Sequence, residues 1–437
     1  MKVISRALLS LVCLILLTIA WLTVLRAQTS DEKQATLMNK ADTYTSDGIY
    51  ILAAPLLEEA TGYSTKHTLE AEDKLKNVYL NLIDESGYAQ KYTDLLNKQM
   101  GRKDAVPDVF IEAANYYIKN SNLTEALTVL KNGIAKTDNN QLVTMYEDNR
   151  YAYNTGYETY DDVTAIYGTS IGVKRDEHWG LANSDGVLQV PCQYDKISTF
   201  DSGRAIVCKD ETIYAIDGNN NRIALLKDSD SDFGNYADGL VPIQTNEGWI
   251  RDTGDFTPGR VRFEQIGMYN GGYAAAEQNG KWGVVDTASI WLIPPEYDGI
   301  ITDELGRAYA QGAVFVKTGG LIELFVNGNP SDITFDDAKP FGDINYAAVE
   351  KNGKWGFIDT TGTLKIDYQF DDALSFGQHL AAVQEDGLWG YVSLSGKVVI
   401  DPVFQQAKSF CNGSAPVLTN NGWQFISLVE YVKGAVL

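Results

Sequence analysis

The chain has 437 residues, of which 44% are hydrophobic and 11% aromatic. This composition excludes a disordered polymer, because such chains lack the apolar residues that build a core. The formal net charge of -22 argues against a nucleic-acid-binding protein, which needs a basic face for phosphate contacts. At roughly 150 residues per domain, the length predicts a multidomain protein of two or three domains.

A single long apolar segment lies near the amino terminus. Residues 7–25 contain no charged residue and would span roughly 28 Å as a helix, close to the hydrocarbon thickness of a membrane. Lys2 and Arg6 precede the segment, which favours an amino terminus inside the cell. The sequence therefore predicts a signal anchor over residues 1–27, a single transmembrane helix, with the rest of the chain outside the cytoplasm. A cleaved secretory signal, and hence a secreted protein, is the alternative.

Apolar residues follow a helical spacing in the next part of the chain, and polar breaks recur 39 and 35 residues apart. This period predicts an all-α region of stacked helical hairpins over residues 28–156. Residues 107–140 resemble a tetratricopeptide repeat at its small and aromatic positions, which are held by Ala114, Tyr117, Ala126, Leu130 and Gly133. Such arrays usually present a groove to peptides or partner helices. A helical spacer without a binding role is the alternative.

The remaining residues, 157–437, repeat a pattern marked by tryptophan. Trp-Gly or an equivalent recurs eight times at intervals of 33 to 39 residues, and the longest interval precedes Leu321. The marked positions are Trp179, Tyr214, Trp249, Trp282, Leu321, Trp355, Trp389 and Trp423. A sustained period of this kind indicates a repeat architecture and outranks local propensity.

Each repeat reads as a meander of three strands. Asn-Gly pairs such as Asn352-Gly353 supply the left-handed residues of hairpin turns, and alternating apolar residues follow them. Such a meander cannot bury its own apolar face, so neighbouring units must stack with the repeated Trp as filler. The Gly after the Trp allows close approach of the next backbone. We expect the periodic carboxylates to cap turns by accepting backbone N–H bonds, and these are Asp195, Asp298 and Asp371.

These residues resemble the WG-repeat family, a bacterial β-repeat named for its Trp-Gly dipeptide. The resemblance covers residues 157–437 and implies a repeat scaffold with no assigned reaction. We therefore expect an all-β array of about eight units with structural positions at Trp179, Trp249, Trp282, Trp355, Trp389 and Trp423. The array begins with the back half of a unit and ends with a front half. If the halves pair, the array is a propeller-like ring, and if they do not, it is an open β-superhelix.

The sequence shows no clear catalytic or metal-binding constellation. His67, His178 and His379 lie in different units, which argues against a catalytic triad or a zinc site. No nucleotide-binding fingerprint occurs, and we expect no cofactor.

Two further groups of residues have alternative interpretations. Asp228, Asp230 and Asp232 have the carboxylate spacing of a calcium loop, but the loop lacks its usual glycine and its bidentate glutamate, so a solvated acidic loop is preferred. Cys192 and Cys208 could pair across their unit, although free, partly buried thiols are the preferred interpretation.

The sequence thus favours a membrane-anchored, extracytoplasmic scaffold that binds other proteins of the envelope or helps to assemble them. A glycan- or cell-wall-binding module that stacks sugars on exposed aromatic residues is the alternative. An enzyme is not expected, because no pair of carboxylates stands outside the repeat register.

Overall fold

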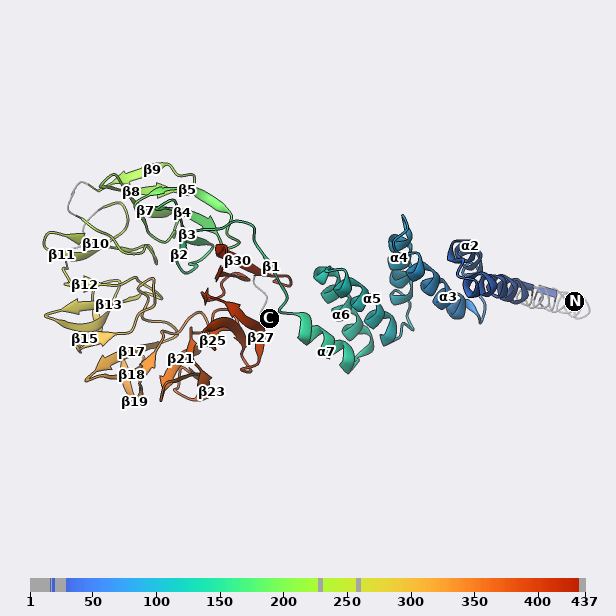
Figure 1. The fold of residues 1–437 in the computed structure, drawn as a ribbon. Helices are drawn as coiled ribbons and strands as arrows, with labels where there is room; N and C mark the ends of the chain where they lie inside the picture. Colours follow the sequence, from blue (N-terminus) through green and yellow to red (C-terminus); the bar gives the residue numbers. More distant parts are fainter. Residues whose placement is uncertain (1–15, 17, 20–28, 227–230, 257–260, 432–437) are drawn as a thin grey trace, which may run out of the picture. The chain divides into compact units, whose positions relative to one another are not determined.

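The computed structural model describes residues 16, 18–19, 29–226, 231–256 and 261–431 (Figure 1). It contains two compact units, which divide between Glu147 and Asp148. Residues 7–25, on which the predicted transmembrane helix depends, lie almost entirely outside the described residues. In the described part of the chain no helix is long and apolar enough to cross a membrane. The fold-class prediction is corrected on this point, since the described fold contains no transmembrane helix.

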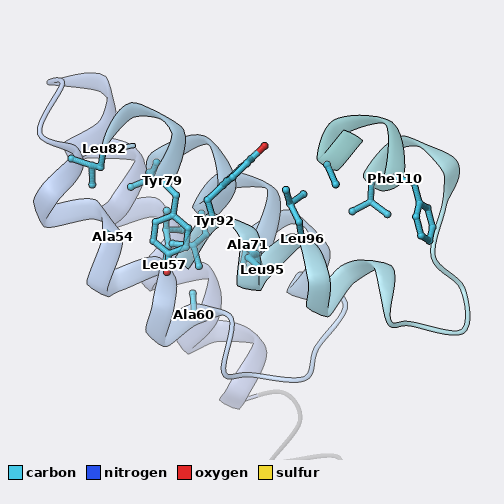
Figure 2. Close-up of a cluster of buried hydrophobic side chains, with 14 of the residues drawn as sticks. Ala54, Leu57, Ala60, Ala71, Tyr79, Leu82, Tyr92, Leu95, Leu96 and Phe110 are labelled. Carbon is cyan, nitrogen blue, oxygen red and sulfur yellow. The ribbon is translucent and has the colours of Figure 1, made fainter. Parts of the chain in front are cut away.

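Seven helices make up the described part of the helical unit. After a first helix over residues 29–46, the helices are α2 (Tyr50–Ala60), α3 (Thr68–Asn81), α4 (Tyr88–Met100), α5 (Pro107–Lys119), α6 (Leu123–Thr137) and α7 (Asn140–Asn149). Pro107 begins α5 at a position where its missing N–H costs nothing, and the Asn122 side chain caps α6. Figure 2 shows side chains of α2 to α5 filling the space between these helices.

Small residues let α5 and α6 approach closely. Ala114 and Ala126 are completely buried. A Cβ atom on Gly133 would lie 2.9 Å from side-chain atoms of both Phe110 and Leu142. The small residues therefore serve helix packing, which is the role that the sequence pattern predicts for them.

A buried carboxylate joins α3 to the end of α4. The Glu72 side chain is completely buried and receives hydrogen bonds from Arg102 at 2.6 Å and Gln99 at 3.2 Å, while Lys98 lies 3.1 Å away. Two cations and an amide compensate the cost of burying this charge.

The β unit contains seven four-stranded antiparallel sheets and one two-stranded sheet, arranged around a common centre (Figure 1). We call the seven larger sheets blades 1 to 7 in chain order. The first three are blade 1, β2 (Asp162–Val163), β3 (Ser170–Arg175), β4 (His178–Asn183) and β5 (Leu188–Tyr194); blade 2, β6 (Lys196–Ile197), β7 (Arg204–Lys209), β8 (Thr212–Asp217) and β9 (Arg222–Leu225); and blade 3, β12 (Gln265–Ile266), β13 (Tyr273–Gln278), β14 (Lys281–Asp286) and β15 (Trp291–Tyr297). The next three are blade 4, β16 (Gly299–Ile300), β17 (Ala313–Thr318), β18 (Leu321–Val326) and β19 (Asn329–Phe335); blade 5, β20 (Asp337–Ala338), β21 (Tyr346–Lys351), β22 (Lys354–Asp359) and β23 (Leu364–Phe370); and blade 6, β24 (Asp372–Ala373), β25 (Leu380–Glu385), β26 (Leu388–Ser393) and β27 (Val398–Phe404).

Blade 7 is built from both ends of the β unit. It combines β28 (Gln406–Ala407), β29 (Ser414–Thr419) and β30 (Gly422–Leu428) with β1 (Tyr153–Thr155), which pairs antiparallel with β30. This pairing excludes the open superhelix, because the first strand of the unit completes its last sheet.

The predicted fold class is also wrong in its description of the repeats. Each blade has four strands rather than three, since a two-residue strand precedes the meander. The sequence predicts about eight units, but the unit at Trp249 forms only β10 (Val241–Thr245) and β11 (Gly248–Asp252). Single bridges, from Phe233 to Ile243 and from Trp249 to Phe263, stand where the other two strands would pair.

The Trp-Gly dipeptide marks a bulge in the four blades that carry it, blades 1, 3, 5 and 6. In blade 6, Trp389 pairs with Phe404 and Tyr391 pairs with Ile400, so three residues of β27 face Gly390 alone. A Cβ atom on Gly390 would lie 2.4 Å from the Ile400 carbonyl oxygen. Glycine is therefore required by the close approach of the outer strand, as the sequence predicts.

The repeated tryptophans pack into the blades. Trp355, Trp389 and Trp423 are at least nine-tenths buried, and Trp179, Trp249 and Trp282 are partly buried. Their neighbours are other repeat residues, such as Phe370, which is opposite Trp355 in the sheet.

The prediction that periodic carboxylates cap turns is confirmed. Asp195 Oδ2 accepts the Asp210 N–H at 2.9 Å, and Asp371 Oδ2 accepts the Asp386 N–H at 3.0 Å. Asp298 Oδ2 does the same for Gly319 at 2.9 Å. These carboxylates are therefore occupied by structural hydrogen bonds.

Asp252, at the end of β11, and Asp359, at the end of β22, have pKa values shifted in opposite directions. Asp252 is 3% exposed, and burial raises the pKa of its carboxyl to about 6 although the amides of Gly254 and Phe256 donate to it. Burial acts in the same direction on Asp359, but the Thr361 hydroxyl and the Lys365 ammonium outweigh it and lower the pKa of Asp359 to about 2.

We predict that Asp252→Asn stabilises the β unit at neutral pH. Because the folded-state pKa lies above the ordinary value of 3.8, the contribution of Asp252 to stability is fully present below about pH 4 and is lost as the pH rises through about 6. The variant should exceed the wild type by roughly 3 kcal/mol at pH 7.5 and match it near pH 4. Urea unfolding across this range measures the difference. Asp359→Asn is the control, since it should lose stability at neutral pH, and a gain there would contradict the assignment.

Candidate functional site

One blade sends an unusually long loop into the centre of the β unit. Between the first and second strands, five blades have six-residue loops, for example residues 374–379 in blade 6, and blade 5 has seven residues, 339–345. The corresponding loop of blade 4 runs over residues 301–312 and has twelve. We call residues 301–312 the plug loop.

The plug loop contacts residues of other units of the ring. Leu305 is 4% exposed and shares a hydrophobic cluster with Ala237 and Met268, against which Tyr167 of blade 1 packs. The Leu305 carbonyl accepts a hydrogen bond from Asn235 Nδ2 at 2.9 Å. The loop is thus anchored by both apolar and polar contacts.

The tip of the plug loop is a tight turn held by one carboxylate. Asp303 Oδ1 accepts the N–H groups of Leu305 and Arg307 at 3.0 and 2.9 Å, and Asp303 Oδ2 accepts Arg307 Nε at 2.6 Å. Gly306 has φ +88°, which L side chains rarely adopt. Glu304 also forms an ion pair with Lys408 of blade 7. These contacts place the Arg307 guanidinium in a defined position.

A pocket of about 540 Å³ lies beside the plug loop. Its wall is formed by the plug loop together with the inner segments of blades 5, 6, 7 and 1. Aromatic and aliphatic residues, among them Phe341, Leu374 and Trp389, alternate with charged ones. The volume lies within the usual range for sites that bind small molecules or short peptide segments.

The charged residues of the pocket differ in their partners. Burial tends to lower the pKa of Arg307, but Asp303 and the charge of Asp343 outweigh it and raise the pKa, so Arg307 stays positively charged. Lys339 lies over the Trp355 ring, 4.8 Å from its centroid. Burial raises the pKa of the Cys411 thiol to about 11, which keeps this thiol protonated at neutral pH.

The predicted site residues are only partly brought together here. Of the six repeat tryptophans, Trp389 lines the pocket. Of the three carboxylates of the low-preference calcium loop, Asp228 and Asp230 lie outside the described residues, and Asp232 forms an ion pair with Lys196 at 2.6 Å. Within the described ranges no group of three metal-ligating residues occurs. Cys192, Cys208 and Cys411 are free thiols in the structure.

Sequence reasoning did not find the plug loop or its arginine. The signal was present as the 39-residue interval before Leu321, the longest in the array. This interval indicates an insertion, but it does not show that the extra residues enter the ring.

Comparison with known proteins gives the family of the repeats. A family model described as "WG containing repeat" matches residues 179–212, 261–282, 331–355, 355–389 and 389–423. The β unit is a propeller with five matches to this repeat. The plug loop lies outside all five matched segments, as do β16, β17 and β18 of the same blade. No curated protein matches the chain.

Similarity to solved structures is low. Hsv2 of Kluyveromyces lactis is 12% identical with a TM-score of 0.34, covering 63% of this chain and 98% of that one. YCF48 bound to D1 peptide is 15% identical, with a TM-score of 0.32 and coverage of 61% and 99%. BBS1N in complex with ARL6DN is 12% identical, with a TM-score of 0.32 and coverage of 64% and 97%. Similarity at this level carries no information about the pocket.

Proposed function

We propose that this WG-repeat protein is a protein-interaction scaffold and that the pocket beside the plug loop receives a segment of a partner protein. The observation that carries the proposal is the pocket itself, which has mixed apolar and charged walls and a tip turn held rigid by Asp303. A site whose side chains are already held in place loses little conformational entropy on binding. The proposal assigns binding rather than catalysis.

The helical unit extends this proposal. Its tetratricopeptide-like pattern, with Gly133 at the close contact between α6 and its neighbours, supports a second surface for peptides or helices. An extracytoplasmic location, with envelope proteins as partners, rests on the amino-terminal sequence alone. Accessibility of the folded units to protease added outside intact cells tests that location.

Stacking of glycans receives less support than protein binding. The repeat aromatic residues are largely buried, and Tyr157 is the one strongly exposed aromatic side chain in the described part of the chain. A row of exposed rings, which sugar stacking needs, is therefore not formed by the repeat positions.

We predict that Asp343→Trp abolishes partner capture by the tagged full chain. Asp343 is exposed and lines the pocket, so an indole at this position fills space that a partner would occupy. The measurement is recovery of partners from detergent-solubilised membranes, compared by mass spectrometry with the wild type.

Lys351→Trp is the matched control for this experiment. Lys351 is exposed at the β21–β22 turn of the same blade and does not line the pocket. The control should keep all partners. Equal recovery with Asp343→Trp and wild type would show that partners bind elsewhere.

A further inference from the structure

Arg307 has hydrogen-bond donors that the protein leaves unused. Its Nε donates to Asp303, whereas its two terminal nitrogens have no hydrogen-bond partner among the described residues. The side chain is 22% exposed and lines the pocket. A guanidinium has five N–H donors and no acceptor, so a partner with two acceptor oxygens fits its free edge.

A second cation without a carboxylate partner lines the same pocket. Lys339 lies over the Trp355 ring, and the described part of the chain contains no ion pair to its ammonium. Lys408, by contrast, is already paired with Glu304. Two of the three cations therefore keep donors available for a ligand.

The acidic residues of the pocket limit how much negative charge a ligand can bring. Asp303 and Glu304 are neutralised by ion pairs, but Asp343 and Asp372 are not paired with a cation in the described part of the chain, and the whole chain carries a formal net charge of -22. A strongly acidic segment would be repelled. A single carboxylate on an otherwise apolar segment matches both the free donors and walls such as Leu374 and Trp389.

We propose that the pocket recognises one carboxylate of an apolar peptide segment, with Arg307 binding the carboxylate and Lys339 assisting. This inference rests on the proposed function and specifies the chemistry of the partner. The carboxylate has two possible sources, a chain terminus or an acidic side chain, and both present the same pair of oxygens to the guanidinium.

The test uses the full chain and three pentapeptide libraries made from Ala, Leu, Phe and Gly. The first library has free carboxyl termini, the second is amidated, and the third is amidated with one central Glu. We expect the first or the third library to bind at least tenfold more tightly than the second, and the library that binds identifies the source. Equal binding of all three libraries, or no binding of any, overturns the inference.

Variants assign the recognition to Arg307. Arg307→Gln should reduce the preference for carboxylate-bearing peptides at least tenfold. Arg307→Lys should retain part of this preference, because the positive charge remains although the bidentate geometry is lost. Lys339→Met leaves the Asp303–Arg307 contact intact and should reduce the preference several-fold. Arg222→Gln is the control, since Arg222 is exposed on β9 and does not line the pocket. An unchanged preference in Arg307→Gln overturns the assignment.

The two proposals fail in different ways. If Asp343→Trp loses its partners but the wild type shows no preference for carboxylate peptides, the pocket is the binding site and the carboxylate proposal is wrong. If Asp343→Trp keeps its partners, the proposal that the pocket binds them is wrong. Thermal unfolding of each variant separates loss of binding from loss of the fold.

Discussion

The Gly390→Ala variant is expected to lose about 3 kcal/mol of unfolding free energy, with a fall in Tm on the order of 10 °C. The added Cβ would lie 2.4 Å from the Ile400 carbonyl oxygen and 2.7 Å from the Pro402 nitrogen. Both are backbone atoms, so no side chain can rotate away to make room. The bulge of β27 would have to shift as a unit. Thermal unfolding followed by circular dichroism measures the loss.

Gly299→Ala serves as the matched control for this substitution. A Cβ on Gly299 would approach nothing closer than 3.7 Å, to the Lys317 side chain, which is an ordinary van der Waals distance. This variant should unfold within about 1 kcal/mol of the wild type. If Gly390→Ala were equally stable, the explanation of the Trp-Gly dipeptide by close approach would be wrong.

Replacing Asn154 by Pro is expected to destabilise ring closure by about 3 kcal/mol. Hydrogen bonds from Gly156 N to Phe425 O and from Val429 N to Ala152 O flank the pair of Asn154 with Ser427. Since bonded pairs alternate along an antiparallel ladder, the Asn154 N–H faces β30. Proline removes this donor from the three-residue strand that completes blade 7. Hydrogen exchange should show faster exchange in β30 than in the wild type.

Thr155→Pro tests whether the lost hydrogen bond causes the effect. By the same alternation the Thr155 N–H faces away from β30 at the sheet edge, where proline is tolerated. Both residues are exposed. Unchanged exchange in β30 is therefore expected for Thr155→Pro, and equal damage by both substitutions would show that proline strains the strand generally.

The repeat pattern was predictable because its causes are local. A left-handed turn pair such as Asn352-Gly353, with φ of 55° and 77°, follows from residue type alone. The same holds for the turn-capping role of Asp371. The glycine after tryptophan is a short-range requirement as well, since the outer strand of its own blade covers it.

The errors in the predicted fold class come from structural features that produce no periodic pattern in the sequence. A two-residue strand such as β24 is too short to show alternation, so four strands per blade were not visible. The unit at Trp249 keeps its marker residue but forms only two strands, which gives seven complete blades rather than eight. Pairing of β1 with β30 joins residues more than 270 positions apart, from Thr155 to Ile426, and no local signal encodes it.

The candidate site also combines features that the sequence predicts with features that only the folded ring creates. Each wall segment belongs to a repeat that the sequence identifies, and the insertion before Leu321 is visible as a long interval. Arg307 lines a pocket together with Lys339 and Cys411 only because five blades face one another in the folded ring.

By itself, the sequence determined the helical and β composition, the repeat and its marker residues, because spacing and turn chemistry act within a few residues. The tertiary structure alone decided that the array closes, that one unit remains incomplete and that the plug loop borders a pocket. These depend on contacts between distant segments, whose free energy is gained only when the whole ring is assembled.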